Sequence, residues 1–195
     1  MFYNLAILKM KKIFILLTFL VSCSTFAFAQ IYKIGDYYND GKKEGVIFEV
    51  SEDGKHGKIV SMKQSAKELQ WSSDATAQKY YTGADNWNDG LYNMNKIKSI
   101  SGWEKKYPAF KWCVDMGEGW YLPAPLELVA IHNNAEKLNP KLVDKLNFDD
   151  NCWYWTSLDD NESSGETAGL IEMRFGDPNS FNKSEVSYVR AVAAF

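Results

Sequence analysis

Strand-like sequence at both ends of the chain encloses a helical middle, and this order constrains the fold more than any other feature. Apolar residues alternate or form β-branched runs within 31–62 and again within 153–195. Between these regions, apolar side chains recur at steps of three or four residues, which is the period of a helix. Strands followed by helices and then by strands predict an α+β fold with a small antiparallel sheet and two or three helices.

The N-terminal region is predicted to form a β-hairpin. Two β-branched runs, 45–50 and 58–62, flank the glycine-bounded segment 52–57. An Asp-Gly pair between such runs is typical of a hairpin turn. The next residues, 63–85, are polar and mixed, so we expect a loop there with one short helical turn.

Three segments of the middle region are predicted to be helical. They are 89–100, 103–115 and 124–137. The third has the clearest pattern, because its apolar residues, among them Leu128, fall on one face of a helix. A further helical turn is expected at 140–146.

The last third is predicted to contain three strands joined by two polar loops. The strands cover 153–157, 168–175 and 186–195, and the loops cover 158–167 and 176–184. Both loops are rich in Asp, Asn, Ser and Glu. Binding residues are often carried by loops on a rigid scaffold, so these two loops are candidates for a recognition surface.

Residues 1–29 have the layout of an export signal. Three lysines precede the apolar run 13–21, and a small-x-small cleavage sequence, AFA, ends at residue 29. The apolar run is too short for a membrane span, which needs about 20 apolar residues. We therefore expect a signal peptide that is cleaved after Ala29.

A second processing route competes with simple cleavage. Residues 20–23, with the sequence LVSC, resemble a bacterial lipoprotein signal in which Cys23 is lipidated. That acyl chain would be the protein's one link to a membrane. Either route predicts a bacterial protein that is secreted, periplasmic or on the cell surface. Residues 30–195 would be its single domain, with 30–62 as an N-terminal hairpin extension.

The charge of the exported part excludes one class of partner. Residues 1–29 contain three lysines and no acidic residue, so residues 30–195 hold 19 basic and 25 acidic side chains. The resulting formal charge of −6 argues against a nucleic-acid partner, which would need a basic surface.

Two cysteines remain in the exported part, Cys113 and Cys152. Outside the cytoplasm they could form a disulfide that closes a loop of about 40 residues. Alternatively, both are buried thiols that act as small apolar side chains. The sequence leaves both alternatives open.

Three motifs in the second half of the chain resemble those of a known fold. Residues 117–128 (GEGWYLPAPLEL) resemble the G-W-x-L-P-T-x-x-E-L signature of C-type-lectin-like folds. Residues 154–157 (YWTS) resemble a Y-W-S-S strand, and residues 188–195 (YVRAVAAF) resemble a terminal V-R-x-V-R-x-F. Together the motifs cover about 86–195. They are similar to the C-terminal domain family of the Legionella collagen-like adhesin, within the formylglycine-generating-enzyme-like group.

The resemblance implies a C-type-lectin-like fold and a non-catalytic binding module. In this fold the late loops share one exposed face, so the partner would be a glycan or a surface protein. The resemblance gives the large apolar motif residues a structural role: Trp120, Leu122, Leu128, Trp153 and Trp155. The candidate ligand-binding residues are Asp159, Asp160, Asn161, Glu162, Asp177, Asn179 and Asn182.

The enzymes of the same group provide the alternative function. A formylglycine-generating oxidoreductase would use paired cysteines, and Cys113 and Cys152 do not occupy the motif positions of that pair. No catalytic residue is therefore assigned.

No metal or other cofactor is predicted. The two histidines, His56 and His132, are far apart and lack ligand spacing around them. Calcium is the one alternative, because hard oxygen ligands gather near the acidic residues of the late loops. Those residues are Asp159, Asp160, Glu162 and Asp177. Calcium sites of classical C-type lectins use a Glu-Pro-Asn type loop that is followed by Trp-Asn-Asp. In this chain Trp-Asn-Asp, at 87–89, comes before the Asp-Pro-Asn sequence at 177–179, so the lectin calcium site is not assigned here.

Overall fold

A computed structural model of the 195-residue chain describes residues 30–148, 152–160 and 165–195. Residues 31–195 form one compact unit. The predicted export signal, with Cys23, lies outside the described residues, as do Asn161 and Glu162. Within the described part of the chain, none of the helices has the length and apolar character needed to cross a bilayer.

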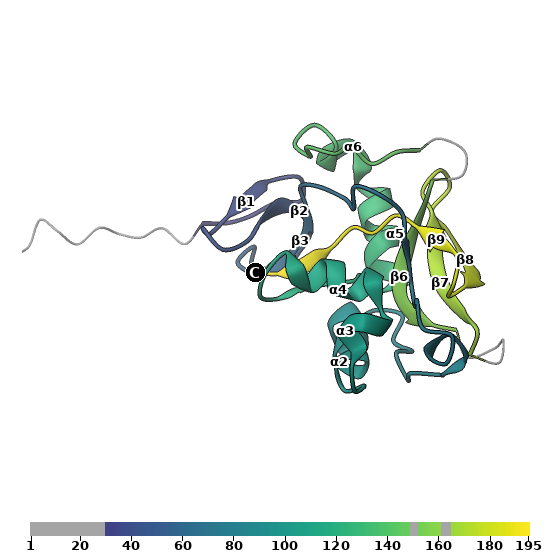
Figure 1. The fold of residues 1–195 in the computed structure, drawn as a ribbon. Coiled ribbons are helices and arrows are strands. Elements are labelled where there is room, and N and C mark those ends of the chain that lie inside the picture. Colours follow the sequence, from purple (N-terminus) through teal and green to yellow (C-terminus); the bar gives the residue numbers. More distant parts are fainter. Residues whose placement is uncertain (1–29, 149–151, 161–164) are drawn as a thin grey trace, which may run out of the picture. The chain divides into compact units, whose positions relative to one another are not determined.

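A five-stranded antiparallel sheet joins the two ends of this unit (Figure 1). Its strands, in order, are β1 (Tyr37–Asn39), β2 (Glu44–Val50), β3 (Gly57–Ser61), β10 (Val192–Ala194) and β5 (Trp120–Tyr121). The predicted hairpin is confirmed as β2 and β3. The last strand, β10, pairs with β3, so the hairpin is part of a sheet that also contains the C-terminal strand.

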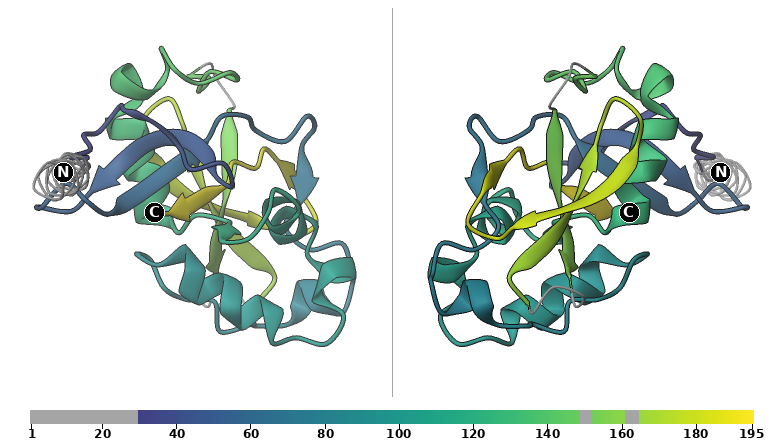
Figure 2. Two further views of the ribbon diagram at one scale, coloured as in Figure 1. Left: turned by 90° about the vertical axis from the view of Figure 1, so that its left-hand side faces the viewer. Right: turned by 90° about the vertical axis from the view of Figure 1, so that its right-hand side faces the viewer.

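A second antiparallel sheet carries the last third of the chain. Its strands are β6 (Trp153–Asp159), β7 (Thr167–Glu172) and β8 (Asp177–Asn182). A two-stranded ribbon of β4 (Leu69–Gln70) and β9 (Val186–Ser187) completes the strands of the described residues. Figure 2 shows α5 (Pro125–Asn133) alongside the three-stranded sheet, where it contacts β6 and β7. The α+β prediction is therefore confirmed.

Two predictions for the last third are wrong. Segment 176–184, predicted as a polar loop, contains β8, and all six of its residues pair with β7 in unbroken register. Most β8 side chains are exposed, so the strand lacks the apolar alternation that would have revealed it. The expected strand 186–195 is divided between β9 and β10, which belong to different sheets. The fully buried Arg190 lies between them and donates to the carbonyl of Ser61 at 3.0 Å.

The predicted helices are confirmed, with three differences, the first of which is that the segment expected over 103–115 is divided at Tyr107. The structure contains α2 (Gly90–Lys98), α3 (Trp103–Lys106) and α4 (Pro108–Asp115), besides the 3-10 turn η1 (Ala77–Lys79). The helix expected over 124–137 is divided at Asn134 into α5 and α6 (Ala135–Leu138). Residues 140–146 form turns and irregular structure instead of a helical turn.

Two buried tryptophans connect the polar segment 63–85 to β6. The indole Nε1 of Trp71 donates to the carbonyl of Thr156 at 2.9 Å, and that of Trp155 donates to the carbonyl of Leu69 at 2.7 Å. Buried indoles normally find such a partner. Because both rings are fully buried, this segment is fixed against the sheet although it has little regular structure of its own.

The structure contains no bond between Cys113 and Cys152. Cys113 is a free thiol on α4 with no exposed surface, and Cys152 is also buried. Burial raises the pKa of the Cys113 thiol well above its usual value. Since the thiolate is the reactive form, Cys113 is a small core side chain and a poor nucleophile.

Cys113 should therefore resist alkylation in the folded protein. Iodoacetamide treatment of native protein, followed by peptide mass spectrometry, is expected to leave Cys113 unmodified, whereas denatured protein should be alkylated fully. Rapid labelling of Cys113 in native protein would contradict its buried position, and resistance in denaturant without reductant would indicate a disulfide.

Candidate functional site

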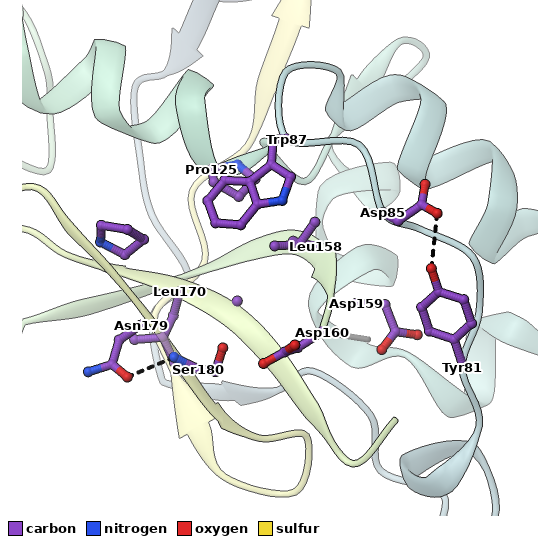
Figure 3. Close-up of a pocket in the computed structure, with 12 residues that line it drawn as sticks. Tyr81, Asp85, Trp87, Pro125, Leu158, Asp159, Asp160, Leu170, Asn179 and Ser180 are labelled. Atoms are coloured by element: carbon purple, nitrogen blue, oxygen red, sulfur yellow. Dashed lines mark hydrogen bonds between the residues drawn. The ribbon is translucent and has the colours of Figure 1, made fainter. Parts of the chain in front are cut away.

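A pocket of about 470 Å³ is lined by residues of all three strands of the three-stranded sheet and by the start of α5 (Figure 3). Its apolar lining comes from Leu158 on β6, Leu170 on β7 and Pro125 at the start of α5. Asp160 and Asn179 contribute polar groups. A concave site of this size that combines apolar side chains with a few polar groups is a candidate small-molecule site.

The segment before α2 supplies an aromatic wall to the pocket. Trp87 keeps 47% of its surface exposed, although large aromatic rings are normally buried. Figure 3 shows its indole beside Pro125. The backbone N–H of Leu126 donates to the carbonyl of Trp87 at 3.0 Å, so the ring is held near the first turn of α5.

A buried carboxylate on α5 fixes the helix starts that flank Trp87. Glu127 accepts hydrogen bonds from the backbone N–H of Gly90 at 3.2 Å and of Ala124 at 2.8 Å. Its other oxygen lies 3.0 Å from the Lys58 ammonium. Burial raises the pKa of Glu127, and the Lys58 charge opposes that rise. A side chain at Gly90 would come within 2.5 Å of the Leu122 carbonyl, so glycine permits this close approach.

Tyr81 and Asp85 form a hydrogen-bonded pair on the same wall. The Tyr81 hydroxyl donates to the Asp85 carboxylate at 2.9 Å. Burial, together with this hydrogen bond, raises the pKa of Tyr81 to about 12, so the phenol stays protonated at neutral pH. The pair thus presents one negative carboxylate beside an aromatic ring at the pocket.

Behind the pocket, Asp159 and Lys183 form a buried ion pair. Their charged atoms are 2.6 Å apart, and both side chains are fully buried. The other Asp159 oxygen accepts from the backbone N–H of Thr82 at 2.6 Å and from its hydroxyl at 2.7 Å. Burial raises the pKa of Asp159, while the Lys183 ammonium and the Thr82 donors oppose that rise.

Lys183 connects the ion pair to the aromatic wall. Its ammonium donates to the carbonyl of Tyr80 at 2.9 Å and lies 4.8 Å from the centre of the Trp71 ring. The backbone N–H of Asp159 also donates to the carbonyl of Ala84 at 2.7 Å. Residues 80–84 are therefore fastened to the sheet at several points, and Tyr81 and Asp85 are fixed with them.

The structure brings only some of the predicted site residues together. Asp159, Asp160 and Asn179 line the pocket. Asp159 is engaged by Lys183, so its carboxylate is not the exposed ligand that the sequence predicted. Asp177 pairs with Glu172 and does not line the pocket, although its neighbour Pro178 does. Asn182 is the last residue of β8, and its side chain accepts from the Ser184 N–H at 2.9 Å.

Sequence reasoning missed the aromatic wall. Tyr81, Asp85 and Trp87 lie in a segment that was predicted as an ordinary loop and turn, far in sequence from the late strands. The polar residues after Trp87 have a structural role, because Asp89 caps α2 by accepting from the Tyr92 N–H at 2.9 Å. Trp87, directly before this cap, could have signalled a site, since a tryptophan beside a polar helix start often has no core position to fill.

The acidic residues considered for calcium do not form a common site in the described residues. Among 30–148, 152–160 and 165–195, no three side chains of the ligating types gather in a group that could hold a metal ion. Asp159 forms an ion pair with the Lys183 ammonium, and Asp177 is not among the residues that line the pocket with Asp159 and Asp160. Glu162 lies outside the described residues.

Comparison with the sequence profiles of known protein families gives no match for this chain, and comparison with curated proteins gives none. The interpretation of the pocket therefore depends on its own geometry and chemistry.

Proposed function

We propose that this chain is an exported, non-catalytic module of C-type-lectin-like fold that binds a saccharide in the pocket. The observation that carries the proposal is the exposed indole of Trp87 at a concave pocket lined by both apolar and polar side chains. A sugar has a C–H face that packs on aromatic rings and hydroxyl groups that need hydrogen-bonding partners. The proposed site offers both in a small space.

The polar groups of the pocket suit sugar hydroxyls. Asp85 and Asp160 are carboxylates, which accept hydrogen bonds, and Asn179 carries an amide that both donates and accepts. Asp85 and Asn179 are exposed, so a ligand can reach them. Buried contacts hold the lining side chains in place, so ligand binding would cost little conformational entropy.

The lectin-like part of the proposal is supported by where the motif residues lie. Trp120, Leu122, Leu128 and Trp155 are all buried, as core residues of that signature would be. The Glu of the motif, Glu127, organises the start of α5. The fold suggests a binding role by analogy, while the pocket itself suggests the ligand.

Export and anchoring are proposed from the sequence of residues 1–29 alone. Mass spectrometry of the mature N-terminus would distinguish cleavage after Ala29 from a lipidated Cys23. A mature chain that retains residues 1–29 would contradict both routes.

The alternative, an oxidoreductase that uses paired cysteines, gains no support from the cysteine geometry. Cys113 is a fully buried thiol with a raised pKa, which is the opposite of an activated nucleophile. If the ligand is a protein instead of a saccharide, it would bind in the same pocket, and the binding experiments would reveal this.

Replacing Trp87 with alanine should abolish or strongly reduce saccharide binding. Loss of one stacking ring is expected to weaken binding by about tenfold or more, because such anchors cost about 2 kcal/mol or more when truncated. A glycan array probed with purified residues 30–195 would first identify ligands, and calorimetry with a bound saccharide would compare the variants.

Phe175→Ala is the matched control, since Phe175 is 65% exposed and does not line the pocket. It should bind like the unchanged protein, and thermal unfolding should show that both variants are folded. Equal binding by Trp87→Ala would refute the pocket as the site, and an array without any bound glycan would refute the saccharide proposal.

A further inference from the structure

The charged groups that line the pocket all have the same sign. Asp85, Asp159 and Asp160 are among its lining residues, whereas none of the described lining residues is Lys, Arg or His. The Asp159 carboxylate is paired with the Lys183 ammonium, and the Asp160 carboxylate accepts from the Thr167 hydroxyl at 3.0 Å. Asp85 and Asp160 are the carboxylates nearer to solvent, since Asp85 is exposed and Asp160 is partly buried.

Asp85 is held in a fixed position by a neutral partner. Its carboxylate accepts from the Tyr81 hydroxyl at 2.9 Å, and that phenol carries no charge at neutral pH. The hydrogen bond orients the carboxylate without cancelling its charge. The indole of Trp87 adds a second group that attracts a cation, because the face of an aromatic ring is negative.

We infer that the pocket selects an amino sugar whose nitrogen is unacetylated and therefore positively charged. This inference rests on the proposed saccharide function and specifies its substrate class. The sugar ring would pack on Trp87, and the ammonium would lie beside one of the two carboxylates nearer to solvent, Asp85 or Asp160. The net negative charge of residues 30–195 would also favour approach of such a ligand.

A matched pair of ligands tests the inference. Glucosamine oligosaccharides and N-acetylglucosamine oligosaccharides of the same length share the ring and the linkage but differ in the charge on nitrogen. Calorimetry with residues 30–195 should show that the charged oligosaccharide binds about tenfold tighter, a difference of about 1.4 kcal/mol, because a hydrogen bond to a charged group is stronger than one between neutral groups. Added salt should reduce this preference.

Variants connect the preference to the pocket. Asp85→Asn and Asp160→Asn keep the shape of each side chain but remove its charge, so at least one of them should reduce the preference severalfold. An unchanged preference in both would contradict the inference. Asp115→Asn is the control, because it removes an exposed carboxylate that does not line the pocket. It should leave the preference unchanged.

The outcomes distinguish this inference from the function on which it rests. Equal affinity for the two oligosaccharides, or a preference for the acetylated one, would overturn the amino-sugar inference and leave saccharide binding in place. Binding to no saccharide on the array would refute both. Tighter binding of a lysine-rich peptide than of the glucosamine oligosaccharide would overturn the inference in favour of a protein ligand.

Discussion

Replacing Asp159 with alanine is expected to lower the free energy of unfolding by about 3–5 kcal/mol, because the Lys183 ammonium would be left buried without its counter-charge. The Thr82 N–H and hydroxyl would lose their acceptor in the same variant. Urea denaturation followed by tryptophan fluorescence would measure the change.

Two further variants make this prediction specific. Removing both charges, in Asp159→Ala with Lys183→Met, should give a protein more stable than Asp159→Ala alone, since no uncompensated charge remains. The exposed pair of Lys111 and Asp115, 2.5 Å apart on α4, is the control. Asp115→Ala should change stability by at most about 1 kcal/mol, because exposed ion pairs contribute little. A double variant no more stable than the single one would contradict the account of the buried pair.

Replacing Trp71 with alanine is expected to destabilise the domain by about 3–5 kcal/mol, which is the usual cost of removing a large buried aromatic side chain. The ring packs edge-on against Tyr107 and Phe110, with ring centroids 5.5 and 5.0 Å away. It also lies 4.8 Å from the Lys183 ammonium. Its loss would therefore loosen both the core and the support of the pocket wall.

Trp71→Phe separates the two roles of this residue. Phenylalanine keeps most of the apolar volume but leaves the buried carbonyl of Thr156 without its indole donor. A smaller loss of about 1–3 kcal/mol is expected, since that is the cost of an unsatisfied buried polar group. If Trp71→Phe were as destabilising as Trp71→Ala in the same denaturation experiment, ring volume would not be the main contribution.

Local patterns explain why much of the fold could be predicted. The hairpin of β2 and β3 depends on two β-branched runs and a turn that are close together in sequence, and α2 depends on apolar spacing and the Asp89 cap. β8 could not be recognised, because an exposed edge strand with polar side chains has the composition of a loop. The division of the C-terminal segment depends on long-range pairing of β10 with β3, which no local pattern contains.

Only the part of the pocket that comes from the late strands could be predicted from the sequence. The acidic residues after β6 correctly indicated part of the pocket lining, as Asp160 shows. The opposite wall comes from Tyr81 to Trp87, more than 70 residues earlier, and only the folded chain brings it there. Asp159 was misassigned because its partner, Lys183, is 24 residues away and its burial could not be read from a polar local sequence.

The account depends on a saccharide ring that packs on Trp87. A crystal structure of residues 30–195 with a bound glucosamine oligosaccharide tests this most directly. We predict the sugar in the pocket, with one face on the Trp87 indole and its nitrogen beside the carboxylate of Asp85 or Asp160. A sugar bound on another surface, with Trp87 free of contact, would contradict the account.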